Sequence, residues 1–204
     1  MDLNLKKDSF CVLSNGVRFN HPQTHKKAEK KLVKAQQEVS KKQLGSKNRE
    51  KAKSLYSRQW EKVVNQNKDT FYKMVNEFKE YDGIVREDLK IRNMIKNNRL
   101  SKAIFRANWG TFNQILAHRV EDTGGQVVKV SPYNTTQKCS DCGELSKEKV
   151  KLSQRTFYCW NCNLELDRDI NSARNILDKA IENNGFGVNL CREAGIAFKQ
   201  EMKN

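Results

Sequence analysis

The sequence lacks long apolar runs: no stretch approaches the roughly 20 apolar residues that a membrane-spanning helix needs. The N-terminus also lacks the basic segment followed by an apolar segment that is typical of a signal peptide. No internal repeat is evident. Disulfides are not implied, because Cys11 and Cys191, the two cysteines outside Cys-x-x-Cys pairs, are isolated in the sequence. These absences favour a protein of the reducing cytoplasm with no membrane partner.

Acidic residues are scarce relative to basic ones. The chain has 24 Asp and Glu against 39 Lys and Arg, a formal net charge of +15 and a pI near 9.6, and 37% of its residues are hydrophobic. This balance indicates a polyanionic partner, most often nucleic acid, although an ordinary solvated basic surface is the alternative. At 204 residues, the chain can hold one core and a small appended module, so we expect two domains at most.

Two Cys-x-x-Cys pairs, Cys139/Cys142 and Cys159/Cys162, dominate the C-terminal half. Sixteen residues separate the inner cysteines, a spacing that allows four thiolates to surround one tetrahedral zinc ion. Two disulfides or a thioredoxin-like redox pair are alternatives, but redox motifs do not come as matched doublets. A four-cysteine site has no open position, so the predicted zinc is structural and any reaction depends on other residues.

The N-terminal half predicts a strand hairpin followed by a helical hairpin. An apolar run over residues 10–13, a Ser-Asn-Gly turn over 14–16 and alternation over 17–19 predict two short strands. From residue 24 to about residue 79, apolar residues recur at spacings of three and four, which predicts two antiparallel helices with a break near Gly45. The lysine-rich first helix could lie along a phosphate backbone or present an ordinary solvated face.

The rest of the chain alternates between strands and helices. Residues 84–89 and 127–130 predict strands, residues 100–121 predict one amphipathic helix whose apolar stripe includes Phe105, and residues 170–181 predict a last helix. This order predicts an α/β domain with a small sheet covered by helices. The expected divisions are a core over 1–133 that includes the helical hairpin 24–79, a four-cysteine module over 134–166, a final core segment over 167–182 and a flexible tail over 183–204.

Three acids occupy notable positions in these elements. Asp2 opens the first sheet, where a solvated terminal carboxylate is the default interpretation. Glu87 shares the apolar face of its strand with Val85, and burying a lone carboxylate is costly unless it is paired or binds a metal. Asp169 stands where an N-cap of the last helix is expected, so simple capping is its default role. Spacing alone does not select these three among the 24 acids.

A family resemblance does select them. The chain resembles the C-terminal half of TnpB, a family of transposon-encoded RNA-guided DNA endonucleases related to type V CRISPR effectors. The likeness covers nearly the whole chain and rests on motifs in a specific order: Met1–Leu5, Leu13–Gly16, Ile84–Leu89, Trp109-Gly110, Val128–Val130, Tyr133–Gly143, Arg155–Cys159, Asp167–Leu177 and the closing Lys199-Gln200-Glu201.

The resemblance implies a RuvC-like nuclease fold, a variant of the RNase H fold, with a zinc ribbon inserted before the last catalytic acid. Asp2, Glu87 and Asp169 fall on the family's three metal-binding positions, and we choose Asp169 over Asp167 because it directly precedes the Ile-Asn-Ser-Ala turn. Two magnesium ions held by these acids, with manganese as a substitute, would support hydrolysis of a phosphodiester bond.

The implied partners are DNA and a guide RNA, and Lys138, Arg155 and Arg168 are predicted to bind nucleic acid. Family members carry a further strand and a long RNA-binding region before the first acid, so the chain is interpreted as N-terminally truncated, with a separately encoded N-terminal part as a further partner. Three residues depart from the family pattern, since the usual residues are Gly, Gly and Ala at the positions of Asn4, Asn163 and Ser172.

Three functions remain open at this point. The first is a magnesium-dependent endonuclease of TnpB type, RNA-guided when complete. The second is a truncated, non-cleaving nucleic-acid-binding protein with a regulatory role, built on the zinc ribbon. The third is a structural zinc-ribbon adaptor, which explains the cysteines but gives no role to Glu87 or to the acid-rich turn at Asp167.

Overall fold

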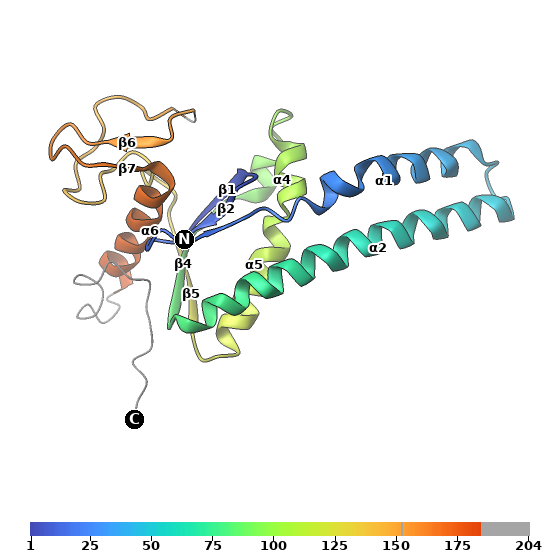
Figure 1. Cartoon of the computed structure of the whole chain (residues 1–204), viewed down its shortest axis with the longest axis horizontal. Coiled ribbons are helices and arrows are strands. Elements are labelled where there is room, and N and C mark those ends of the chain that lie inside the picture. The colour runs from blue at the N-terminus through green and yellow to red at the C-terminus, as the bar shows by residue number, and fades with distance from the viewer. Residues whose placement is uncertain (152, 185–204) are drawn as a thin grey trace.

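A computed structural model describes residues 1–151 and 153–184 of the chain, so Cys191, the closing Lys199-Gln200-Glu201 and nearly all of the expected tail lie outside the described residues. In Figure 1 a helical hairpin projects to one side, and a two-stranded ribbon lies at the opposite end with the last helix beneath it. The elements in chain order are β1 (Asp2–Lys6), β2 (Ser9–Val12), β3 (Arg18–Phe19), α1 (Thr24–Lys41), α2 (Lys47–Asn76), η1 (Glu77–Glu80), β4 (Gly83–Glu87), α3 (Ile91–Met94), α4 (Ser101–Ala107), α5 (Trp109–Glu121), β5 (Gln126–Val130), β6 (Thr156–Tyr158), β7 (Glu165–Asp167) and α6 (Arg168–Asn184).

The N-terminal sheet has three antiparallel strands in the order β1, β2, β3. The sequence predicted two strands here, and β1 is the addition. Its residues alternate between polar and apolar side chains, and the apolar ones, Leu3 and Leu5, pack against the core. A half-buried strand has this period of two. The strand places Asp2 opposite Val12 of β2.

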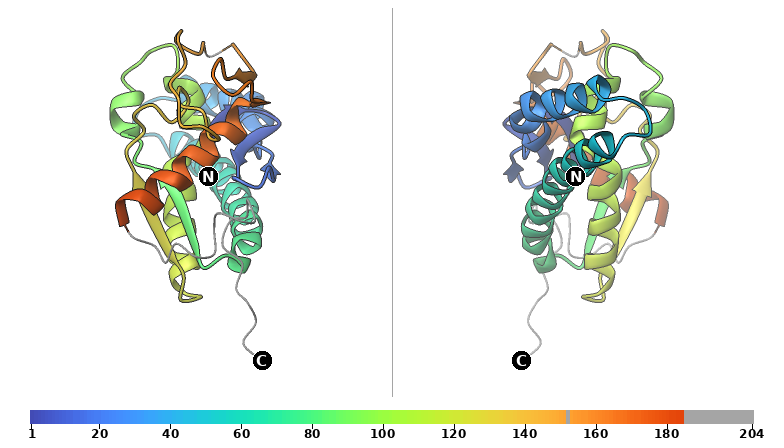
Figure 2. Two further views of the ribbon diagram at one scale, coloured as in Figure 1. Left: turned by 90° about the vertical axis from the view of Figure 1, so that its left-hand side faces the viewer. Right: turned by 90° about the vertical axis from the view of Figure 1, so that its right-hand side faces the viewer.

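The second sheet pairs β4 and β5 in parallel, from Gly83 opposite Gln126 to Glu87 opposite Val130. Successive residues of β4 face opposite sides: Ile84 joins the cluster formed with α2 and α5, whereas Val85 packs with Val130 and with Ile176 of α6. α6 therefore covers one face of this sheet, and it crosses β4 and β5 in the left-hand view of Figure 2.

A short connection joins the two sheets. The backbone nitrogen of Met1 donates a hydrogen bond of 2.6 Å to the carbonyl of Val85. This bond brings the start of β1 beside the middle of β4. Asp2 and Glu87 therefore lie near each other, although 85 positions separate them in the sequence. Two parallel strands and a neighbouring antiparallel sheet covered by helices form the α/β architecture that the sequence predicted.

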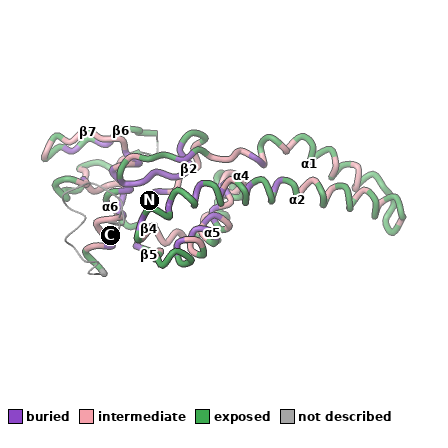
Figure 3. Tube along the Cα trace, turned by 60° about the horizontal axis from the view of Figure 1, so that its bottom comes forward, coloured by how far each residue is buried: buried purple, intermediate pink, exposed green. Residues whose placement is uncertain are grey.

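The helical hairpin is confirmed in position and in its break. α2 begins with Ser46 as its N-cap, whose hydroxyl accepts a hydrogen bond of 3.2 Å from the backbone of Arg49. Only the inner end of α2 enters the core, through residues such as Phe71 and Val75, and Figure 3 shows that the outer parts of both helices are largely exposed. The span 24–76 carries 15 Lys and Arg against five Asp and Glu, a net charge of +10 out of the chain's +15.

The prediction of a single helix over residues 100–121 is wrong. α4 and α5 are separate helices that meet at Asn108, which has a left-handed backbone with φ of 52°. Because of this break, the buried residues of α4 and α5 do not form one continuous helical stripe. Ile104 is buried, but Phe105, which the sequence placed in the apolar stripe, is 58% exposed.

Two phenylalanines test this description of the core. Phe71 is fully buried and its ring contacts those of Phe10 and Phe112. We expect Phe71→Ala to lower the free energy of unfolding by about 3–5 kcal/mol, because it removes a large buried ring and leaves a cavity. Phe105→Ala is the matched control and should change it by less than about 1 kcal/mol. Urea denaturation of both variants measures the difference, and equal losses would contradict the assigned core.

Candidate active site

Three carboxylates from separate segments gather where β1, β4 and α6 meet. Asp2 lies on β1, Glu87 ends β4 and Asp169 is in the first turn of α6. Asp2 is 9% exposed and Asp169 only 1%. Burial, followed by the negative charges of Glu87 and Asp169, raises the pKa of Asp2 from 3.8 to about 7. Burial also raises the pKa of Glu87. The pocket therefore holds more negative charge than its surroundings stabilise, which is a property of cation sites.

Each of the three carboxylates has one oxygen bound by a donor side chain. The Asn4 amide donates 3.2 Å to Oδ2 of Asp2, the Thr135 hydroxyl donates 2.5 Å to Oε1 of Glu87, and the Lys6 ammonium forms an ion pair with Oδ2 of Asp169.

One carboxylate oxygen is left buried without a hydrogen bond. Oδ1 of Asp169 has no hydrogen-bond partner among the described residues, although the Arg168 guanidinium lies 3.7 Å away. A buried carboxylate oxygen that accepts no hydrogen bond, beside two other acids, fits a divalent cation with oxygen ligands.

The carboxylates are not drawn tightly together. Among the described residues, the four cysteines form the one set of three or more ligand atoms that all lie within 4.8 Å of one another. Like charges that lie apart repel one another less, and the two side-chain cations that pair with these acids in the described part of the chain, Lys6 and Arg168, both contact Asp169.

Asp167 and Asp169 have different roles, and the sequence assigned the cap to the wrong one. Oδ1 of Asp167 accepts hydrogen bonds from the backbone of Asp169 at 2.9 Å and of Ile170 at 3.2 Å, so Asp167 caps α6. Its other oxygen forms an ion pair of 2.9 Å with Arg18. Because both oxygens of Asp167 are engaged, Asp169 is the better placed of the two acids to hold a metal.

The four cysteines form two matching turns. The residue that follows each pair, Gly143 or Asn163, has positive φ of 76° or 59°, and its backbone donates to the first cysteine of its pair. The sulfurs of Cys139 and Cys162 are 3.7 Å apart and those of Cys142 and Cys159 are 3.5 Å apart. Metal–sulfur bonds of about 2.3 Å put the sulfurs of a tetrahedral site roughly 3.8 Å apart, so one ion fits this cluster.

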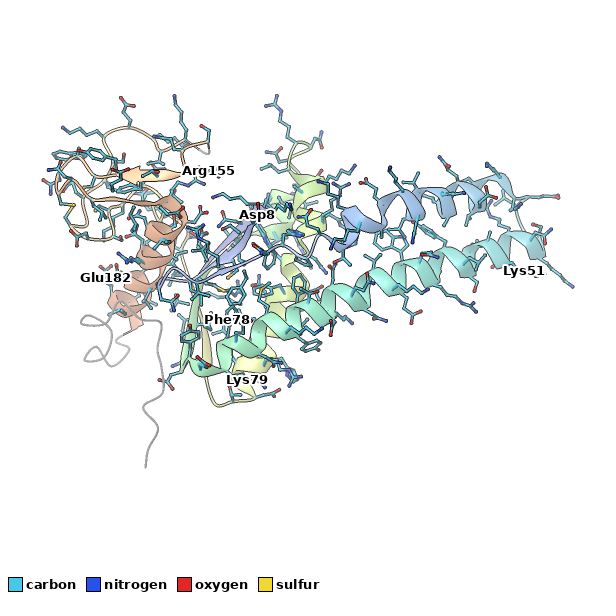
Figure 4. All side chains as sticks on the ribbon, viewed as in Figure 1. Asp8, Lys51, Phe78, Lys79, Arg155 and Glu182 are labelled. Carbon is cyan, nitrogen blue, oxygen red and sulfur yellow. The ribbon has the colours of Figure 1, made fainter. Side chains whose placement is uncertain are left out.

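The three residues predicted to bind nucleic acid lie in different environments. Arg155 is exposed at the edge of the ribbon, as labelled in Figure 4. Lys138 is partly exposed, 3.8 Å from Glu182. Arg168 is only 7% exposed and its guanidinium donates 2.9 Å to the carbonyl of Lys151, so its guanidinium is committed to holding the loop before β6.

The sequence did not identify the residues that support the carboxylates. Lys6, Asn4 and Thr135 contact the three acids, and Asn171 and Asn175 of α6 contact the loop that carries Thr135. Two weak signals existed. Asn171 and Asn175 are spaced by four residues on one helical face, and Asn4 follows Asp2 by two residues on one strand face.

The protonation of Asp2 predicts how stability depends on pH. Its pKa is raised in the folded protein, so between about pH 4 and about pH 7 the unfolded chain loses a proton that the folded chain retains. Stability of the metal-free protein should therefore fall as pH rises through this window. Thermal unfolding at pH 5 and pH 8 measures the change, and Asp2→Asn should reduce the difference between the two melting temperatures. An unchanged difference would mean that Asp2 is not the group responsible.

No helix in the described part of the chain combines the length and hydropathy that a membrane span requires. A family model described as "Probable transposase" matches residues 1–98, and one described as "Cas12f1-like, TNB domain" matches residues 109–176.

Relatives are similar along almost all of the chain. It is 31% identical to a "Putative RNA-guided DNA endonuclease" of Streptomyces pristinaespiralis over 96% of this chain and 49% of that protein. It is 33% identical to "Putative RNA-guided DNA endonuclease InsQ" of Escherichia coli (strain K12), over 94% and 51%. The chain thus spans about half the length of these relatives.

A solved structure supports the fold. The structure titled "Cryo-EM structure of the Cas12f1-sgRNA-target DNA complex" superposes with a TM-score of 0.58 at 18% identity, over 86% of this chain and 48% of that one. Two family models in sequence order, two relatives along nearly the whole chain and this fold agree with the motifs read from the sequence, and the chain belongs to the TnpB family.

Proposed function

We propose that this chain is the catalytic part of a TnpB-type DNA endonuclease with a RuvC-like core, and that it is RNA-guided in its complete context. One observation carries the proposal: Asp2, Glu87 and Asp169, three acids remote in sequence, lie close enough that the charges of Glu87 and Asp169 raise the pKa of Asp2. Asp2 and Asp169 are buried and Glu87 is partly buried. The relatives named as RNA-guided DNA endonucleases support the same class of reaction. The structure titled as a Cas12f1 complex with guide RNA and target DNA supports both partners.

Asp2, Glu87 and Asp169 are the residues that would hold magnesium or manganese, and such ions supply an activated water and charge stabilisation at the leaving oxygen. The chain's own contribution is orientation. Asn4 and Thr135 fix one oxygen each on Asp2 and Glu87, which limits how these side chains rotate. The cap provided by Asp167 fixes the first turn of α6 and thereby the direction of Asp169.

Zinc is the metal that we propose for the four cysteines, in a structural role. Four sulfur ligands without an oxygen or an open position favour zinc over magnesium or manganese. The backbone of Glu144 and the side chain of Asn161 lower the pKa of Cys142 to about 6, so this thiol is ready to bind as a thiolate. The ribbon so formed would support the loop that carries Thr135.

The basic helical hairpin provides a surface for nucleic acid. Most of the chain's net positive charge lies on α1 and α2. A groove between the two helices is lined by apolar side chains, by Glu38 and by four lysines, Lys31, Lys34, Lys42 and Lys51. Glu38 pairs with Lys42, and the excess of lysines over acids along the projecting hairpin favours contacts with phosphates. We assign Arg155 and Lys138 to the same partner and give Arg168 a structural role.

Binding without cleavage is the second candidate function. The Lys6–Asp169 ion pair favours it, because an ammonium on a carboxylate competes with a metal for the same oxygen. Cleavage and binding are separable in one experiment.

Two neighbouring acids provide a matched test. We expect the purified chain to nick single-stranded DNA with magnesium or manganese, and Asp169→Asn to abolish the nicking, because the variant loses a charged metal ligand. Asp167→Asn should keep activity, since Asn is also a good N-cap. Electrophoresis of labelled DNA measures nicking and filter binding measures affinity. Cutting by Asp169→Asn would overturn the site assignment, and DNA binding without cutting by the unaltered chain would establish the second candidate function.

The cysteine cluster predicts a link between metal content and folding. Cys159→Ser should lower both bound zinc and the free energy of unfolding, because a closed structural site contributes directly to folding. Cys11→Ala, which alters a buried cysteine of the N-terminal sheet, should leave the zinc content unchanged. Elemental analysis and thermal unfolding measure the two quantities. Full zinc content in Cys159→Ser would argue against the ribbon.

A further inference from the structure

Thr135 lies between β5 and the first cysteine turn and is only 2% exposed. Its hydroxyl is 2.5 Å from Oε1 of Glu87 and 3.2 Å from the carbonyl of Pro132. A threonine hydroxyl has one hydrogen, and the carboxylate is both the closer and the more strongly accepting partner. The hydrogen bond to Glu87 is therefore the one that the hydroxyl forms.

This hydrogen bond restricts a flexible side chain. Glutamate has three rotatable side-chain bonds. A carboxylate that only water contacted would therefore sample several orientations. With Oε1 held by Thr135, the other oxygen of Glu87 has a defined direction relative to β4. A metal ligand oriented in advance by a neighbouring hydrogen bond binds its ion more tightly.

Thr135 is in turn fixed by α6. The amide of Asn175 donates to the carbonyl of Thr135 at 2.8 Å and to that of Lys138 at 2.6 Å. The amide of Asn171 donates 2.8 Å to the carbonyl of Lys138 and accepts 2.9 Å from the backbone of Ser140. Lys138 and Ser140 flank Cys139. The helix that carries Asp169 thus binds both the first cysteine turn and the residue that orients Glu87.

We infer that Thr135 is a positioning residue for Glu87 and that, through Asn175, it links the four-cysteine module to the acid pocket. The inference deepens the proposed function and rests on it, since it takes Glu87 as a ligand of a divalent cation. It assigns the loop over residues 135–140 a task beyond holding zinc: this loop sets the orientation of an acid 48 positions earlier in the chain.

Manganese binding provides a readout that does not require DNA cleavage. Titration of the zinc-loaded chain with Mn²⁺, followed by the electron paramagnetic resonance signal of free Mn²⁺, gives the dissociation constant of the acid pocket, because this hard ion prefers oxygen over thiolate ligands. We expect Thr135→Val to raise this dissociation constant by about 10- to 100-fold. Thr135→Ser, which keeps the hydroxyl, should stay within about threefold of the unaltered chain, a margin well below the change that loss of an orienting partner produces.

Thr136 provides a matched control, because its hydroxyl contacts only the neighbouring Gln137 among the side-chain hydrogen bonds of the described residues. Thr136→Val should bind Mn²⁺ as the unaltered chain does. Unchanged affinity in Thr135→Val would overturn the inference, as would equal losses in Thr135→Val and Thr135→Ser with full zinc content. If Thr135→Val does not fold, Asn175→Ala tests the same link from α6, and unchanged affinity there would also overturn it.

Failure of the proposed function gives a different result. If Asp169→Asn leaves Mn²⁺ binding intact, or if the unaltered chain binds no Mn²⁺, the acid pocket is not a metal site and the role of Thr135 falls with it. If Asp169→Asn abolishes Mn²⁺ binding and Thr135→Val does not weaken it, the metal site stands and only the positioning role is lost.

Discussion

The hydrogen bonds from Asn171 and Asn175 to the carbonyl of Lys138 join α6, which carries Asp169, to the first cysteine turn. Both asparagines are buried, and a buried amide requires partners, which the carbonyls of the 135–140 loop supply. In the same helix, Ile176, which follows Asn175, packs against Val85 of β4. One helix therefore sets the position of the cysteine turns, of β4 and of Asp169 at once.

Local features could be predicted from the sequence because few residues determine them. The cysteine turns follow from two short motifs, and the helical hairpin follows from a spacing that persists over many residues. Features that depend on distant partners could not. Asp167 and Asp169 both suit a helix N-terminus. Their roles are distinguished only by their partners in the fold, Arg18 for Asp167 and Lys6 for Asp169. Thr135 and Lys6 are ordinary residues until the fold brings Glu87 and Asp169 to them, and the acids themselves were found through the family resemblance.

Electrostatics explains why the pocket has its supporting residues. Three carboxylates removed from water repel one another, and the raised pKa of Asp2 is the consequence. Lys6 reduces this repulsion at Asp169, the most buried of the three acids. The Arg168 guanidinium lies 3.7 Å from the other oxygen, Oδ1, so each oxygen of Asp169 faces a cation. In the proposed metal site, Oδ1 is the oxygen that a metal could bind without displacing Lys6, because it accepts no hydrogen bond among the described residues.

The three departures from the family pattern have unequal physical consequences. Asn163 adopts the left-handed backbone that its turn requires, and Asn tolerates that conformation better than most residues. Ser172 places in the interior a hydroxyl that has no hydrogen-bond partner among the described residues, which is costly where the usual alanine has no polar group. Asn4 contacts one of the three acids directly. Its amide donates to Asp2 and lowers the pKa of that acid, opposing the effect of burial. The departure closest to the three acids thus favours the ionised form of Asp2.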